Sequence, residues 1–147
     1  MPDRGVVASI DWLKPSLPAA EFEALQRSNT NRPDAQAFWS IQARNLAKMS
    51  AAGVRIVLGS DGNTPYAPHV EMADMVAAGM TPMQVIVAAT RNGAQFLEDE
   101  PMPARSKRTR APTSSCLMRT LLDDITNTRK IASVYLRGAS VDRSACR

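Results

Sequence analysis

Residues 53–62 read Gly-Val-Arg-Ile-Val-Leu-Gly-Ser-Asp-Gly, and this stretch decides the fold. Apart from Arg55, residues 54–58 are apolar and mostly β-branched, which is typical of a strand covered on both faces in a parallel sheet. Asp61 follows the strand, and functional side chains gather at the carboxyl ends of parallel strands. A carboxylate placed there can bind a metal or move a proton. Asp61-Gly62-Asn63 also has the composition of a simple turn, which is the alternative interpretation.

The segments around this stretch alternate between helix and strand patterns. A helix is predicted from Ala35 to Ala52, capped by Asp34, with Gly53 in the left-handed conformation after its end. Further helices are expected at 21–27, at 69–78 and after Thr81, which begins a capping box. Strands are expected at Gly5–Ile10 and, as a terminal pair, at 131–136 and 139–141. This order predicts an α/β fold.

Length and composition narrow the class of protein. The chain has 147 residues, whereas a complete eight-stranded α/β barrel needs about 250. No apolar run approaches the ~20 residues that cross a bilayer, and the N-terminus lacks the plan of a secretory signal. We therefore expect a cytoplasmic chain with no membrane partner, although export of a full-length relative is compatible with the sequence. Cys116 and Cys146 are far apart, which argues against a zinc ribbon and a disulfide scaffold.

Positive charge is concentrated in one segment. The net charge is +4, and residues 101–119 hold five basic residues and no acidic one: Arg105, Lys107, Arg108, Arg110 and Arg119. The segment is rich in proline and serine and has no helical or strand period, so we expect irregular structure over 101–120. A basic arm that binds nucleic acid is the alternative, but no aromatic residue is present to stack on bases. We expect no nucleic-acid partner.

Few side chains in this sequence suit catalysis. His69 is the single histidine, so the chain cannot build the histidine-rich site that catalytic zinc commonly uses. The sequence contains no nucleophile elbow, P-loop or dinucleotide-binding glycine motif. Ser60 has no histidine and acid arranged with it as a triad. Asp61 therefore remains the leading candidate.

The order of several motifs resembles the amidohydrolase superfamily, in particular its imidazolonepropionase-like and prolidase-like members. The resemblance is carried by residues 52–61, His69-Val70-Glu71-Met72, Ala78-Gly79-Met80-Thr81-Pro82 and Ala88-Ala89-Thr90-Arg91-Asn92-Gly93-Ala94. It implies the C-terminal part of a (β/α)8 barrel-type metal-dependent hydrolase over residues 1–100. It also implies that residues 121–147 form a terminal β-strand pair from the family's small β-sandwich domain.

The resemblance implies hydrolysis of carbon–nitrogen bonds in non-peptide or cyclic amides, or of related bonds, in a small-molecule substrate. Asp61 matches the family's final aspartate, which binds a divalent metal, zinc in our expectation, and accepts a proton from the attacking water. His69 is expected to contact the substrate. The other metal ligands have no counterpart here, so the chain resembles a C-terminal fragment that is inactive alone. The alternatives are a truncated non-enzymatic product and a basic nucleic-acid-binding module. Unburied core surface in a fragment also predicts self-association.

The basic segment departs from the family pattern. One set of codons permitted by residues 101–121, read two bases on, gives DAGTLEADKGADFLVLDANP, which follows the family pattern and leads into the in-frame residues 122–125. We hypothesise a local frameshift over residues 101–120, in the gene or in its sequencing, and the nucleotide sequence tests this. A frameshift would explain the abrupt change of composition without a nucleic-acid partner.

Overall fold

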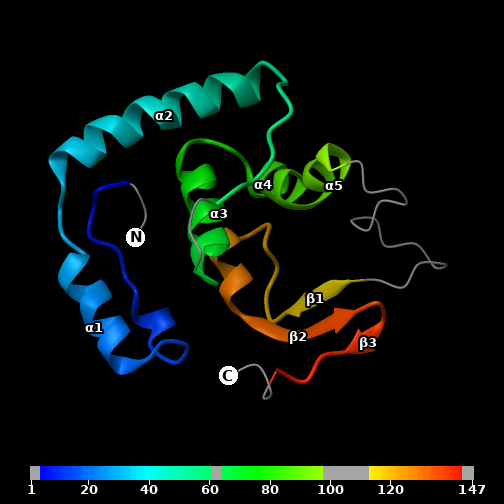
Figure 1. Ribbon diagram of the computed structural model, residues 1–147. Coiled ribbons are helices and arrows are strands. Elements are labelled where there is room, and N and C mark those ends of the chain that lie inside the picture. Colours follow the sequence, from blue (N-terminus) through cyan, green and yellow to red (C-terminus); the bar gives the residue numbers. More distant parts are fainter. Residues whose placement is uncertain (1–3, 61–63, 98–112, 144–147) are drawn as a thin grey trace. The chain divides into compact units, whose positions relative to one another are not determined.

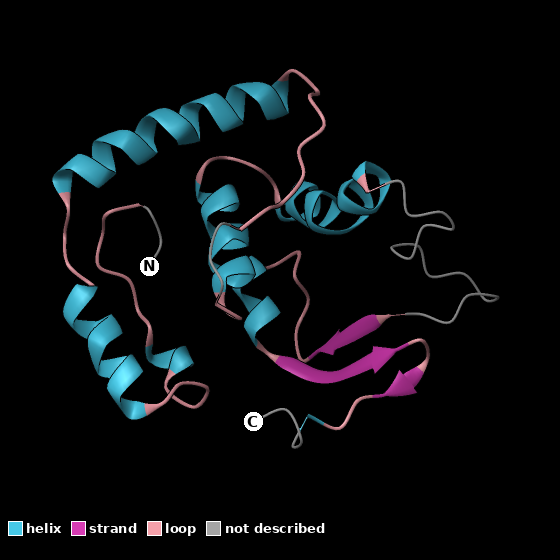
Figure 2. Ribbon diagram, in the orientation of Figure 1, coloured by secondary structure: helices cyan, strands magenta, loops and turns pink. Residues whose placement is uncertain are grey.

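The computed structural model describes residues 4–60, 64–97 and 113–143 (Figure 1). The chain divides into two compact units, residues 1–54 with 59–80 and residues 55–58 with 81–147. All strands of the described residues lie between residues 114 and 140 (Figure 2). The described residues thus have mixed α/β structure with a three-stranded sheet and no closed barrel, which confirms the predicted α/β class only in this coarser form. No helix among them is long and apolar enough to cross a membrane.

The first unit consists of helices. Its elements are η1 (Asp11–Leu13), α1 (Ala19–Ser28), α2 (Pro33–Ala51) and α3 (Ala67–Ala77). A small core of Ile10, Leu13 and Phe22 joins η1 to α1, and Tyr66, just before α3, packs against it. The predicted helices are confirmed, with α1 and α3 each beginning two residues earlier than expected.

The start of α2 differs from the prediction. Arg32, not Asp34, occupies the capping position, and its side chain makes no capping hydrogen bond. Pro33 takes the first helical position, for which the fixed φ of proline is well suited, so Asp34 falls inside the first turn. Its carboxylate is still well placed there, because the helix dipole favours negative charge near the N-terminus. The predicted end is confirmed, since Gly53 has φ 75°.

The predicted strand at Gly5–Ile10 does not form. Gly5 has a left-handed φ of 67°, which interrupts an extended strand. The backbone of Ala8 bonds to the side chain of Asn29 instead, donating to Oδ1 at 3.1 Å and accepting from Nδ2 at 2.7 Å. The amide of Val7 donates to Asn31 at 3.3 Å. Side-chain amides therefore take the place of a neighbouring strand.

The predicted strand at Val54–Leu58 is also absent from the ladders of the described sheet. Four of its residues, 55–58, belong to the second unit, where a helix satisfies part of their backbone. Leu58 N donates to the carbonyl of Ala88 at 3.2 Å, and Asn92 Nδ2 donates to the carbonyl of Ile56 at 2.7 Å. Because a strand needs a neighbouring strand to form a ladder, the segment belongs to no strand of the described sheet.

That helix has three consecutive parts, α4 (Pro82–Val87), a π-helical turn η2 (Ala88–Asn92) and α5 (Gly93–Phe96). The predicted capping box is confirmed: Thr81 Oγ1 accepts from the amide of Gln84 at 3.3 Å, and Gln84 Oε1 accepts from the amide of Thr81 at 2.8 Å. Val85 is fully buried, which fixes the apolar face of the helix.

The second unit also contains the antiparallel sheet, with strand order β1 (Ser114–Leu117), β2 (Ile131–Leu136), β3 (Ala139–Ser140). The predicted terminal strand pair is confirmed as β2–β3. It is joined by Arg137 (φ 51°) and Gly138 (φ 83°), as a two-residue hairpin turn with left-handed central residues requires. Strand β1 differs from the irregular structure that composition predicts for 101–120, since Ser115 pairs opposite Val134. The rest of that segment up to residue 112 lies outside the described residues.

A short helix, η3 (Ile125–Arg129), leads into β2. Asp124 caps it, because its carboxylate accepts from the Thr126 amide at 2.8 Å and the Thr126 hydroxyl at 2.7 Å. These hydrogen bonds, first the side-chain one and then the backbone one, hold the pKa of Asp124 below its ordinary value.

Candidate functional site

Asp61, the predicted catalytic and metal-binding residue, lies outside the described residues, so its role stays a prediction. The described chain stops at Ser60, directly before Asp61, and resumes at Thr64. Gly59 lines a cavity in the first unit.

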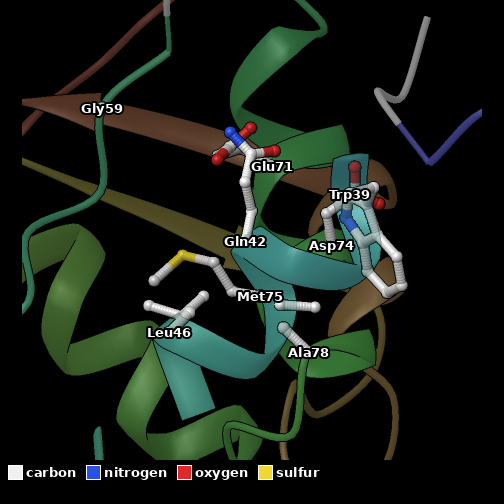
Figure 3. A pocket seen from close by; sticks show the side chains of 9 residues that line it. Trp39, Gln42, Leu46, Gly59, Glu71, Asp74, Met75 and Ala78 are labelled. Atoms are coloured by element: carbon white, nitrogen blue, oxygen red, sulfur yellow. The ribbon is translucent and has the colours of Figure 1, made fainter. Parts of the chain in front are cut away.

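The cavity lies between α2 and α3 and has a volume of about 310 Å³ (Figure 3). Each helix contributes residues at the spacing i, i+3, i+4 and i+7, which places them on one face of the helix. From α2 these are Trp39, Gln42, Ala43 and Leu46; from α3 and its C-cap they are Glu71, Asp74, Met75 and Ala78. The volume is at the lower end of the range of about 300–1,000 Å³ typical of ligand pockets.

Polar and apolar groups occupy different parts of the wall. In Figure 3 the polar ends of Gln42 and Glu71 lie together above, while Leu46, Met75 and Ala78 form the lower part. Trp39 and Asp74 lie to one side of these groups. The cavity can therefore bind a small molecule that has a hydrogen-bonding end and an apolar body.

A charged cluster at this cavity involves the N-terminal segment. The Arg4 guanidinium pairs with the Asp74 carboxylate, and it also lies 5.9 Å from the centroid of the Trp39 ring. Asp74 is 8% exposed, and a carboxylate that buried needs a charged or hydrogen-bonding partner. Arg4 thereby holds residues before α1 against α2 and α3.

His69, the predicted substrate-binding residue, lies on α3 but is not among the residues that line the cavity. Its ring meets the Trp12 ring edge-on, with centroids 6.1 Å apart, and Trp12 meets Tyr66 in the same way at 6.4 Å. His69 thus belongs to an aromatic group beside the small core of the first unit. Its role in substrate binding stays a prediction.

The described residues contain no group of three or more His, Cys, Asp or Glu side chains that could hold a metal ion. A catalytic zinc site commonly needs three protein ligands in addition to water. The described part of the chain therefore does not fit a complete catalytic metal site.

The Arg4–Asp74–Trp39 cluster is the part of the site that sequence analysis missed. The spacing of 71, 74, 75 and 78 on α3 marks one face of the helix, and this signal was available from the sequence. The partner of Asp74 is 70 residues away in the chain, and no local pattern marks Arg4 as that partner.

Comparison with known protein families matches residues 3–99 to the Amidohydrolase family, and the chain belongs to this family. Among solved structures, the chain is similar to one reported as "Structural and catalytic characterization of molinate hydrolase", with a TM-score of 0.62 and 22% sequence identity. The alignment covers 99% of this chain and 31% of that one, so the chain spans about a third of its length. At this identity the similarity concerns the fold alone. No curated protein matches the chain.

Proposed function

We propose that this chain is a C-terminal part of an amidohydrolase-type hydrolase that cleaves carbon–nitrogen bonds in non-peptide or cyclic amides, or related bonds, of a small-molecule substrate. The observation that carries the proposal is the family match over residues 3–99, which includes Asp61 and the motifs on both sides of it. The cavity beside Gly59 supports a site for small molecules near this part of the chain.

In this proposal Asp61 acts as the proton acceptor for the attacking water. A carboxylate suits this role when it is held within hydrogen-bond reach of the water. Its place after the Val54–Leu58 segment is the place where parallel barrels carry functional residues. His69 is proposed to shape the substrate side of the site from α3.

A divalent metal, zinc in our proposal, would be bound by Asp61 in the complete enzyme. Because the described residues do not assemble a metal site, the remaining ligands would have to come from elsewhere. We therefore expect the isolated chain to show no chelator-sensitive hydrolysis.

A truncated product without enzymatic activity is the second candidate. It is favoured by the same absence of a three-ligand group in the described residues and by the coverage of 31% of the similar solved chain. Reconstitution distinguishes the two candidates, because a chain that belongs to a working enzyme restores activity when the missing part is supplied.

The test joins this chain to the N-terminal part of an amidohydrolase barrel and measures chelator-sensitive hydrolysis of a panel of amides and cyclic amides. The Asp61→Asn variant should lose turnover, because an amide cannot accept the proton from water. Asp34→Asn is the matched control, since Asp34 lies on α2 outside the cavity, and it should retain activity. Full activity of the reconstituted Asp61→Asn variant would refute the assignment.

A further inference from the structure

Asn92 lies on the π-helical turn η2 and contacts the segment that precedes Asp61 in the chain. We propose that Asn92 is a positioning residue for the proposed hydrolysis. It holds residues 56–58 in place, and through them the part of the chain that carries Asp61. This role rests on the proposed function, because it concerns the same site, and it needs no contact between Asn92 and the substrate.

Two hydrogen bonds attach residues 56–58 to this helix. The Asn92 side chain donates from Nδ2 to the carbonyl of Ile56 at 2.7 Å. Two residues further along the segment, the amide of Leu58 donates to the carbonyl of Ala88 at 3.2 Å. A segment that is bonded at one point can pivot about it, whereas bonds at two points fix its direction as well as its distance from the helix. The pair of bonds therefore determines the direction in which the chain leaves residue 58.

Of these two hydrogen bonds, only the one from Asn92 depends on the identity of a side chain. Every residue supplies a backbone carbonyl like that of Ala88. The bond between Asn92 and the Ile56 carbonyl is partly buried, and an acceptor that loses its partner away from water is costly. Asparagine is also a weak helix former, because its side chain competes for backbone groups. The bond to Ile56 gives it a use at this position that a stronger helix former lacks.

The segment also packs closely against the helix between the two bonds. A Cβ added to Gly93, the residue after Asn92, would lie 3.9 Å from Val57 Cγ1, which is an ordinary van der Waals distance. Val57 stands between Ile56 and Leu58 in the chain, so the packing and both hydrogen bonds act on three consecutive residues. The bond from Asn92 is therefore part of a continuous contact between the helix and the segment.

Residues 56–58 matter to the proposed reaction because Asp61 follows Leu58 by only three residues. Three residues of chain reach at most about 11 Å, so a shift of residues 56–58 passes readily to the part of the chain that carries Asp61. A general base must lie within hydrogen-bond reach of the proton that it accepts, and a misplacement of about 1 Å can lower a rate about 100-fold. Asn92 can therefore affect catalysis without touching the reacting groups.

The first experiment measures amide hydrogen exchange in the full chain by NMR. Asn92→Asp preserves the size of the side chain but replaces the donor with an oxygen that faces the Ile56 carbonyl. The Leu58 amide should then exchange at least about 10-fold faster, because residues 56–58 are hydrogen-bonded at one point only. Asn45→Asp makes the same chemical change on the exposed surface of α2, and it should leave the exchange of the Leu58 amide unchanged.

The Gln84 amide, in the capping box at the start of the same helix, reports whether the helix itself unfolds. Its exchange should be the same in Asn92→Asp as in the parent chain. Unchanged exchange of the Leu58 amide in Asn92→Asp overturns the proposal. So does an equal acceleration at Gln84, because it would show a general loss of the helix. If Asn92→Asp does not fold, Asn92→Ala takes its place, since it removes the donor without adding a charge.

The second experiment measures steady-state kinetics of the reconstituted enzyme. Asn92→Asp should lower kcat about 10- to 100-fold and leave KM within about 2-fold, because it displaces a reacting group and removes no contact with the substrate. Asn45→Asp should keep both constants. Full kcat in Asn92→Asp, or a higher KM with unchanged kcat, overturns the positioning role and leaves the proposed function intact. An inactive parent enzyme refutes the proposed function instead, and exchange at Leu58 then decides by itself whether Asn92 holds residues 56–58.

Discussion

Adding a methyl group at Gly5 should lower the stability of the folded chain. Its carbonyl accepts from the amide of Arg32 at 2.7 Å and from the side chain of Gln36 at 2.9 Å, so it fixes the N-terminal segment to the start of α2. A Cβ on Gly5 would lie 2.5 Å from the Arg32 carbonyl, 2.8 Å from the Gln36 amide and 2.9 Å from the Ala35 Cβ. Two of these three atoms belong to the backbone, which cannot move aside cheaply.

The expected cost of Gly5→Ala has two parts. The left-handed φ of 67° costs an L-residue about 1–2 kcal/mol, and forcing extra volume into a packed place adds about 1–3 kcal/mol. Together these two costs should lower the free energy of unfolding by about 2–5 kcal/mol. Alanine also reduces the conformational entropy of the unfolded chain, and this effect offsets about 0.4–1 kcal/mol of the loss.

Gly53→Ala is the matched control. Gly53 also has a left-handed φ, 75°, but a Cβ there would meet no heavy atom of the described residues within 4 Å. The two variants share the conformational cost and differ in the steric one. Urea denaturation followed by tryptophan fluorescence suits the comparison, because both tryptophans, Trp12 and Trp39, lie in the first unit with both glycines. Equal losses of stability in the two variants would show that the close contacts around Gly5 are wrong.

Three further predictions concern other parts of the chain. Thr81→Ala should destabilise the α4 helix by about 1 kcal/mol through loss of the capping box, seen as faster exchange of the Gln84 amide, while Thr81→Ser should preserve it. Hydrogen bonds lower the pKa of Asp124 in the folded chain below its value in the unfolded chain. They should therefore stabilise the folded state fully at pH values above the unfolded-state pKa, and this stabilisation should be lost as the pH falls through the folded-state pKa. An NMR titration of Asp124 checks this, and Thr126→Val should move its pKa back toward the ordinary value. Phe38, Ile41 and Met49 are large apolar residues left exposed on α2, so the chain should self-associate in sedimentation velocity, and a monomer that unfolds cooperatively would argue against this.

Elements marked by local chemistry could be predicted from the sequence. Thr81, Pro82 and Gln84 form a helix start whose parts lie within four residues, and the structure contains it. Arg137-Gly138 likewise gives a two-residue turn between β2 and β3. In both cases the interacting groups are neighbours in the chain, so the pattern carries the information.

Elements that depend on distant partners could not be predicted in the same way. Residues 54–58 have the composition of a buried strand, but their described hydrogen-bond partners are Met49, Ala88 and Asn92 from helices. Gly5–Ile10 was expected to pair with a strand and is bonded by Asn29 and Asn31 side chains. The composition of a segment indicates whether the segment can be buried. It does not indicate which other segment packs against it.

The basic segment shows another reason why sequence alone does not predict every element. Its composition gives no strand signal, yet β1 forms at Ser114–Leu117 and pairs along β2. In the re-read sequence this stretch corresponds to Phe-Leu-Val-Leu, which has strong strand character. The β2–β3 hairpin provides an edge that a weak strand can join, so the partner strand decides the structure here.

The π-helical turn at Ala88–Asn92 has a consequence for chain length. A π turn contains one residue more than an α turn. With or without this extra residue, the helical segments on either side can present the same faces, on which Val85 and Ala94 are buried. Deleting one residue between 88 and 92 would therefore leave an ordinary helix. It would also move the Ala88 carbonyl and the Asn92 amide from the positions that serve Leu58 and Ile56. The number of residues in this helix therefore determines, together with their identity, where the segment before Asp61 is hydrogen-bonded to it. A one-codon deletion would break these hydrogen bonds without unfolding the helix.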